Sequence, residues 1–201
     1  MVPDDIESKG ERRRREIIEA TKRCFLSRGF HNTSIARIAK EAGMSTGHIS
    51  HYFPQKELII ETIVKREEDL LAELLQSLDK KSKGSNFLDA LSDEMDAMIE
   101  YTLEPGHAAL RLEIVAEAAR NPRIASILRE SAQHKQHQFV NQASSNDKDG
   151  IFNLEENEQA IRIDILALLL SGLMMRSIYT DIDRKHMARM ITQILTVLWK
   201  E

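Results

Sequence analysis

The sequence has few of the residues that break helices or form disulfides. Its 201 residues include 8 glycines, 4 prolines and a single cysteine, and aromatic residues make up 5% of the chain. A chain rich in alanine, leucine, glutamate, lysine and arginine instead favours helix throughout, so the predicted fold class is all-α. Cys24 alone excludes an internal disulfide and a cysteine-based metal cluster. It also fits a reducing cytosol, and we expect a cytoplasmic protein.

Long hydrophobic runs are missing as well. The longest, at 163–175, is interrupted by Asp164, Ser171 and Gly172, and it is shorter than a bilayer-spanning helix requires. We therefore expect no membrane partner. Hydrophobic residues still make up 42% of the chain and charged residues 30%, which suits a protein that buries a core.

Charge is distributed unevenly along the chain. Residues 1–56 carry 11 Lys+Arg and 7 Asp+Glu, a net +4, whereas residues 57–201 carry 17 and 25, a net −8. A basic N-terminal part followed by an acidic remainder suggests that the first part meets a polyanion. A basic surface that is merely solvated is the alternative.

Residues 43–53 follow the pattern of a helix-turn-helix. A short amphipathic helix is predicted over 34–42, Gly43 lies in a tight turn, and Ser45 or Thr46 can cap a second helix. Helix, short glycine-containing turn and helix form the layout of a unit that reads DNA, in which the later helix enters the major groove.

Apolar residues recur at helical spacing in the rest of the chain, and about nine helices are expected in total. Outside the helix-turn-helix, they are predicted at about 11–28, 54–78, 86–103, 106–120, 121–143, 155–180 and 184–200. The polar segments 80–86 and 144–150 are predicted connections between helices.

An ordered set of residues between positions 17 and 58 resembles a known protein family. The set comprises Ile17, Ile18, Ala20, Phe25, Gly29, Phe30, Thr33, Ser34, Ile35, Ala36, Ile38, Ala39, Ala42, Gly43, Ser45, Gly47, Ile49, Tyr52, Phe53, Lys56 and Leu58. It is similar to the TetR family of bacterial transcriptional regulators. The resemblance implies a three-helix DNA-binding domain at 1–54, followed by a helical effector-binding and dimerisation domain at 55–201.

The recognition helix carries one departure from that family and one hint within it. Ser50 stands where many members have a tyrosine that contacts phosphate. The string Ile-Ser-His-Tyr-Phe is similar to that of the choline-responsive glycine-betaine regulators. A recognition helix reports the operator sequence rather than the effector, so this similarity does not identify a ligand. Aromatic residues make up only 5% of the chain, which argues against an aromatic cage that binds a quaternary amine.

Twelve residues are candidates for contact with DNA. They are Arg12, Arg13, Arg14, Arg15, Thr33, Ser45, Thr46, Gly47, His48, His51, Tyr52 and Lys56. Ile49 and Phe53, four residues apart, are expected to face inward, which leaves Thr46, Gly47 and His48 to face outward. These three residues begin the third helix, so we expect them to read base edges. Phosphate contacts fix the register of a protein on DNA. We expect them from Thr33, Tyr52, Lys56 and the arginines at 12–15.

The phosphate candidates also have structural interpretations. Thr33 could bind phosphate at a helix N-terminus or simply cap that helix. The arginines at 12–15 could contact phosphates, or they could simply be solvated at the start of the helix. Positive charges at a helix N-terminus interact unfavourably with the helix dipole, which costs some stability. Tyr52 resembles the family's phosphate-contacting tyrosine, but it could also pack the third helix against the first. His48 and His51 lack acidic or cysteine partners, so no metal and no cofactor is expected.

The middle helices are expected to enclose a pocket for a small-molecule effector. Its candidate residues are Met95, Met98, Tyr101, Glu113, Glu117, Phe139, Met174 and Met175. Methionine suits loosely specified apolar ligands, although at helical spacing it also fits plain core. An ordinary ion-paired outer face is the alternative for the stripe of Glu113, Glu117 and Arg120.

The two closing helices are too apolar for the surface of a monomer. The predicted dimer interface comprises Ile161, Ile165, Leu168, Leu169, Gly172, Met187, Ile191, Ile194, Leu195 and Leu198. Each helix carries more than one apolar stripe, so one stripe can face the core and another a second copy, giving a four-helix interface. Burial of both stripes within the monomer is the alternative.

The sequence thus predicts a ligand-responsive homodimeric transcriptional regulator, a repressor that a small-molecule effector releases from a palindromic double-stranded DNA operator. The alternative is a helical protein-interaction module with a degenerate helix-turn-helix and no specific DNA binding. No Ser/His/Asp set, nucleophile elbow, phosphate loop or metal-ligand cluster is visible, so an enzyme is not expected.

Overall fold

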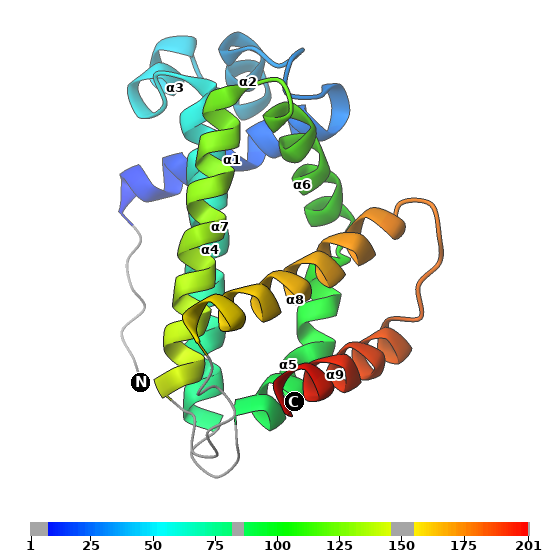
Figure 1. Ribbon diagram of the computed structural model, residues 1–201. Helices are drawn as coiled ribbons and strands as arrows, with labels where there is room; N and C mark the ends of the chain where they lie inside the picture. The colour runs from blue at the N-terminus through cyan, green and yellow to red at the C-terminus, as the bar shows by residue number, and fades with distance from the viewer. Residues whose placement is uncertain (1–7, 82–86, 146–154, 201) are drawn as a thin grey trace, which may run out of the picture. The chain divides into compact units, whose positions relative to one another are not determined.

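The structure is a computed structural model that describes residues 8–81, 87–145 and 155–200. Within these residues every regular element is a helix (Figure 1), as the all-α prediction requires. The elements are α1 (Lys9–Arg28), α2 (Ile35–Ala42), α3 (Thr46–Tyr52), α4 (Lys56–Lys81), α5 (Phe87–Thr102), α6 (Pro105–Ala118), α7 (Pro122–Ser145), α8 (Glu156–Arg176) and α9 (Arg184–Lys200).

The chain is divided into two compact units. The first unit comprises Met1–Val64 and Leu110–Ile127, and the second comprises Lys65–Ala109 and Leu128–Glu201. Helices α4, α6 and α7 each contribute one part to each unit. The N-terminal helices therefore pack with a segment from the middle of the chain, which the predicted division at residue 54 did not include.

Helix α1 begins at Lys9, two residues earlier than predicted, because Ser8 and Glu11 form a capping box. The Ser8 hydroxyl accepts a hydrogen bond from the Glu11 N–H, and the Glu11 carboxylate accepts one from the Ser8 N–H. The helix ends at Gly29, whose φ of 77° lies in the region that favours glycine.

Serines cap both helices of the predicted helix-turn-helix. Ser34 caps α2 by accepting a hydrogen bond from the Arg37 N–H, so the prediction that Thr33 is this N-cap was wrong. Ser45 caps α3 in the same way through the His48 N–H. Gly43 between them is left-handed, with φ 65° and ψ 31°, as a tight turn after a helix requires.

The second unit has its own hydrophobic core, built by helices α5, α8 and α9 with parts of α4 and α7. Its buried members are Leu75, Ala90, Leu91, Met95, Ile99, Leu103, Phe139, Leu166, Leu173, Ala188, Ile191, Leu195 and Trp199. Each large side chain buried there contributes roughly 1.5–3 kcal/mol through removal of apolar surface from water. Among the described helices, none has the length and hydrophobicity needed to cross a membrane.

Polar contacts connect the helices of the second unit around this core. The Gln136 amide of α7 donates to the Ala160 carbonyl at 3.2 Å and to the Asp164 carboxylate at 3.0 Å, both on α8. Arg184, at the start of α9, pairs with Glu100 of α5. These contacts fix the register of the helices that carry the predicted dimer interface.

Candidate nucleic-acid interface

Helix α3 presents a polar face to solvent. Ile49 and Phe53, at 0% and 1% exposed, pack it into the first unit. Thr46, Gly47 and His48 are exposed, as the helical periodicity predicted. Ser50 and His51 are also exposed, so the face available to an external partner extends along the whole short helix.

Gly47 is not required by the fold. A Cβ atom built at this position would meet nothing within 4 Å, and the backbone is ordinary helix. Glycine weakens a helix interior by about 0.5–1 kcal/mol relative to alanine, so its presence here lowers the stability of α3. The missing side chain leaves the α3 backbone open to an approaching partner.

Tyr52 lies at the centre of a group of rings and cations. The rings of His48 and His51 approach it edge-on, with centroids 5.3 and 5.1 Å away. The guanidinium carbon of Arg14, on α1, lies 5.6 Å from the Tyr52 centroid and 5.6 Å from that of Phe53. Tyr52 is half-buried, so it packs α3 against α1, as one of its two interpretations predicted.

The four arginines at 12–15 have different surroundings. Arg12 and Arg13 pair with Glu16, at 3.9 and 2.5 Å, whereas Arg14 faces the aromatic rings of Tyr52 and Phe53. Glu16 and the capping carboxylate of Glu11 offset the cost of positive charge in the first turns of a helix. The hydrogen bonds from Ser8 lower the pKa of the Glu11 carboxyl, which keeps it ionised there.

Two predicted phosphate contacts have side chains that bind backbone carbonyls of the protein itself. The Thr33 side chain is 1% exposed and its hydroxyl donates to the Gly29 carbonyl at 2.8 Å, which contradicts a phosphate contact through that hydroxyl. The Lys56 ammonium donates to the carbonyls of Phe30 and Thr33, at 2.9 and 3.1 Å, and lies 3.9 Å from the Phe30 ring centroid. Desolvation lowers the pKa of Lys56, against the opposing effect of Glu57 and Glu117.

The structure also shows polar contacts that the sequence did not suggest. Arg23 of α1 pairs with Glu41 of α2 at 2.7 Å, and Arg123 of α7 donates a hydrogen bond to Gln55 just before α4. The Phe30 N–H donates to the carboxylate of Glu113 at 2.6 Å across 83 residues of sequence. No local pattern signals these partners, because each pair joins segments far apart in the chain.

The eight predicted effector residues do not lie together in one unit. Glu113 and Glu117 belong to the first unit and the other six to the second. Glu117 is buried and pairs with Arg120 at 2.5 Å, the ion pair that the alternative interpretation of this stripe expects. Both carboxylates therefore already have protein partners.

The remaining effector candidates are divided between core and surface. Met95, Phe139 and Met174 are buried, and Met98 packs against the same core. Tyr101 is exposed and its ring contacts that of His107, with centroids 4.4 Å apart. Met175 is 55% exposed, which contradicts its assignment to the wall of an enclosed pocket. The described residues contain no group of three or more His, Cys, Asp or Glu side chains that could hold a metal ion.

The ten predicted dimer residues fall into three groups by burial. Ile161, Leu168 and Ile194 are exposed. Ile165, Leu169, Gly172, Met187 and Leu198 are half-buried. Ile191 and Leu195 were wrongly assigned to the interface, because they lie inside the core of the second unit.

Comparison with known proteins agrees with this arrangement. The family model described as bacterial regulatory proteins of the tetR family matches residues 17–63. The regulator UidR of Escherichia coli K12 is 29% identical over 127 residues, which are 63% of this chain and 62% of UidR. The regulator BetI of Escherichia coli O139:H28 is 45% identical over 53 residues, 26% of this chain and 27% of BetI. The chain thus matches less than two thirds of the length of either relative.

Solved structures extend the likeness to nearly the whole chain. Salmonella enterica GusR is 25% identical with a TM-score of 0.71, covering 96% of this chain and 98% of GusR. The fatty acid degradation regulator FadR of Bacillus halodurans shares the fold alone, at 16% identity and a TM-score of 0.73 over 91% of this chain and 94% of FadR. UidR, BetI and FadR are named as regulators rather than as enzymes. With its capped helix-turn-helix, its all-helical fold and these relatives, the chain belongs to the TetR family of bacterial transcriptional regulators.

Proposed function

We propose that this protein is a homodimeric repressor that binds a palindromic DNA operator through α3 and is released by a small-molecule effector. The observation that carries the proposal is the exposed polar face of α3, held by Ile49 and Phe53 and open at Gly47. A recognition helix needs these properties, because its side chains and backbone must approach base edges in the major groove.

Thr46 and His48 are the side chains proposed to read bases. Both are exposed in the first turn of α3, next to the open backbone of Gly47. The threonine methyl and hydroxyl suit a thymine methyl or a base-edge acceptor, and an imidazole N–H can donate to guanine or phosphate. Ser45 caps the helix at this position, because its hydroxyl accepts a hydrogen bond from the His48 N–H.

Phosphates on either side of that contact would be held by cations and hydroxyls around α3. Arg14 lies over the Tyr52 ring, and His51 flanks the same ring. Lys56 uses two of its three N–H donors on backbone carbonyls, which leaves one for a phosphate oxygen. Such contacts carry no sequence information, but they fix the register on the duplex.

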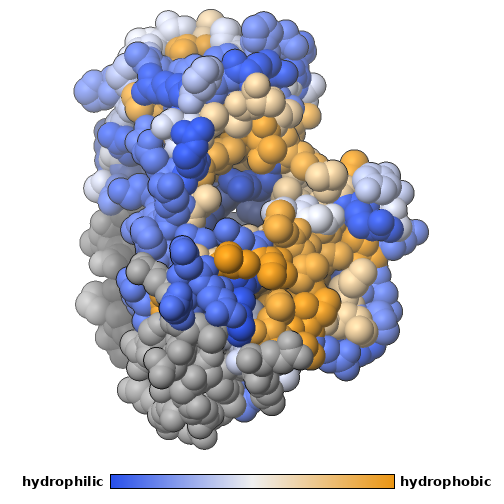
Figure 2. Space-filling model, in the orientation of Figure 1, coloured by the Kyte–Doolittle hydropathy of each residue, from blue (hydrophilic) through white to orange (hydrophobic). Residues whose placement is uncertain are grey.

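The second unit supplies a surface for a second copy of the chain. Ile161, Leu168 and Met175 are exposed at intervals of seven residues on α8, and Met190, Ile194 and Val197 form an exposed stripe on α9. Figure 2 shows the corresponding apolar area over these helices. Exposed apolar surface of this kind marks an interaction site, and two-fold pairing would set two α3 helices one DNA turn apart, about 34–36 Å.

The proposed effector acts by differential affinity for two states of the protein. A coupling of about 1–3 kcal/mol would change operator affinity about 5–150-fold. Met95 and Met174, which are buried in the second unit, are the side chains proposed to adapt to an apolar ligand. We propose no specific effector, since the similarity to BetI is confined to 53 residues.

The DNA-binding part of the proposal is tested by selecting duplexes from a randomised pool with the wild-type protein. Binding of the best duplex is then titrated for Thr46→Ala, Tyr52→Ala, Lys56→Ala and the control Lys185→Ala, an exposed residue of α9. We expect losses of about 1–3 kcal/mol for a base contact at Thr46, and weaker, salt-sensitive losses for the phosphate contacts. Full-strength, sequence-specific binding by the first three variants would refute the assignment. Absence of salt-dependent DNA affinity would favour the protein-interaction alternative.

A further inference from the structure

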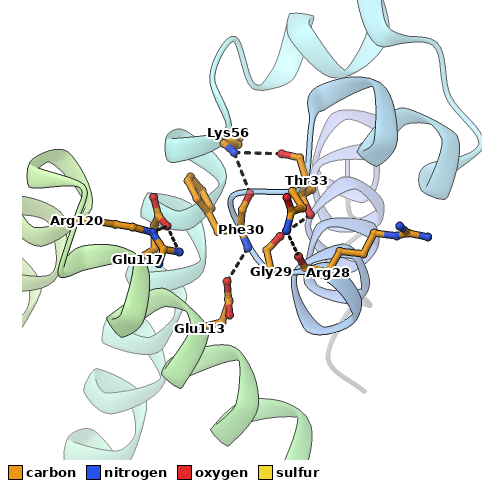
Figure 3. A network of polar contacts seen from close by, with 9 residues as sticks. Arg28, Gly29, Phe30, Thr33, Lys56, Glu113, Glu117 and Arg120 are labelled. Atoms are coloured by element: carbon orange, nitrogen blue, oxygen red, sulfur yellow. Dashed lines mark hydrogen bonds and ion pairs between the residues drawn. The ribbon is translucent and has the colours of Figure 1, made fainter.

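The turn between α1 and α2, residues 29–33, is held by charged side chains from two other helices (Figure 3). Lys56 comes from the start of α4, and Glu113 comes from α6. Both act on the backbone of Phe30, whose side chain packs against Phe25 with ring centroids 5.3 Å apart. All of these residues belong to the first unit.

The polar groups of the Phe30 backbone are bound by these side chains. The Phe30 N–H donates to the Glu113 carboxylate at 2.6 Å, and the Phe30 carbonyl accepts from the Lys56 ammonium at 2.9 Å. The residue is only 2% exposed, so water is a poor substitute for either partner. Leaving a buried N–H without an acceptor costs free energy comparable to a lost hydrogen bond.

Gly29 makes the approach of the carboxylate possible. A Cβ at Gly29 would lie 2.9 Å from the nearer Glu113 carboxylate oxygen, closer than real Cβ contacts allow. The glycine also has a φ of 77°, which a residue with a side chain rarely adopts. The short distance ties the turn to the position of Glu113, and the positive φ independently favours glycine there.

The turn leads directly into the helix-turn-helix. The Thr33 hydroxyl closes the turn on the Gly29 carbonyl, and the next residue, Ser34, caps α2. Helix α2 packs on α3, and Ile38 of α2 and Ile49 of α3 are both fully buried. A side chain that fixes Phe30 therefore helps to fix the helix that reads DNA, and recognition requires positions held to about 0.5 Å.

We propose that Glu113 is a positioning residue for operator binding, acting through the Phe30 N–H rather than through contact with DNA. The inference rests on the DNA-binding function proposed above. It assigns to α6 a part in operator recognition that lies outside residues 17–63, the segment matched by the family. It also replaces the effector-pocket role that the sequence suggested for this glutamate.

The test compares substitutions at Glu113 in the full-length protein, using the duplex selected by the wild type. Glu113→Ala removes the acceptor, Glu113→Asp keeps the charge but shortens its reach, and Glu113→Gln keeps an acceptor of the same length. We expect Ala and Asp to weaken specific binding about tenfold, and Gln by no more than about threefold. Hydrogen exchange at the Phe30 amide should accelerate in Ala and Asp but stay close to wild type in Gln.

Glu61→Gln is the control, since Glu61 is an exposed glutamate of α4 in the same unit and the same charge is removed there without touching the turn. It should retain wild-type operator affinity. Equal operator affinity for the wild type and both Glu113→Ala and Glu113→Asp would overturn the inference, as would a Gln variant as weak as Ala. Failure of the wild type to select any duplex would instead refute the proposed function, and the inference with it. If Glu113→Ala does not fold, the comparison of Asp with Gln decides the matter.

Discussion

The guanidinium of Arg14 lies over two adjacent rings, 5.6 Å from the centroids of both Tyr52 and Phe53. It thereby connects the basic start of α1 to the end of α3. Arg12 and Arg13 instead pair with Glu16 on the same helix. Arg14 thus has a different structural position from Arg12 and Arg13 in the same run.

Replacing Arg14 with alanine should lower both stability and operator affinity. Loss of the contact with the rings is expected to cost about 0.5–1 kcal/mol in the free energy of unfolding, measured by urea denaturation. The change should also weaken binding of the selected duplex. Arg12→Ala is the control, because its pairing with Glu16 at 3.9 Å is exposed and should contribute little. Equal destabilisation by both changes would contradict the distinct position of Arg14.

Gly47→Ala should raise stability while weakening operator binding. A methyl group at this position meets nothing in the protein, and alanine is the better helix former by about 0.5–1 kcal/mol. The same methyl group would stand between the α3 backbone and a base edge. Gly43→Ala is the contrasting change, because its φ of 65° should make alanine destabilising by about 1–2 kcal/mol. Unchanged operator affinity in Gly47→Ala would show that the backbone here does not approach DNA.

The ion pair of Arg23 and Glu41 should make stability sensitive to acid. The hydrogen bond from Arg23 is the main cause that lowers the pKa of Glu41 from its ordinary value of 4.5. A carboxyl whose pKa is lower in the folded state stabilises the fold above its unfolded value and loses that contribution as pH falls through the folded value. Unfolding of wild type and Glu41→Gln, compared at pH 6 and at pH 3.5, should show a smaller fall for the variant. An identical fall in both proteins would exclude this contribution.

Leu168→Lys should disrupt association without unfolding the monomer. The side chain is 70% exposed on α8, so a charge there is tolerated by the single chain but not by an apolar interface between two copies. Sedimentation should show a dimer for the wild type and a monomer for the variant. Leu166→Ala is the control, because this buried residue should instead destabilise the fold by about 2–5 kcal/mol. A dimeric Leu168→Lys protein would place the interface elsewhere.

Local structure could be predicted well from the sequence. The tight turn at Gly43 was predicted correctly, and Ser45, one of two residues predicted to cap α3, is its N-cap. These features are predictable because they depend on residues only a few positions apart. The spacing of Ile49 and Phe53 correctly predicted which side of α3 is buried. Where two neighbouring residues could both cap a helix, as Thr33 and Ser34 could, the backbone geometry of the turn chose the second.

The sequence by itself determined the helices, the helix-turn-helix and the family, since helical periodicity, capping and turn chemistry are properties of short segments. Only the tertiary structure decided how long-range partners are used. It bound the side chains of Thr33 and Lys56 to backbone carbonyls, and it paired the Phe30 N–H with Glu113, 83 residues away. It also placed Ile191 in the core and left Leu168 outside. Periodicity reveals that a helix has two apolar stripes, but the choice between them depends on which other helices pack against it.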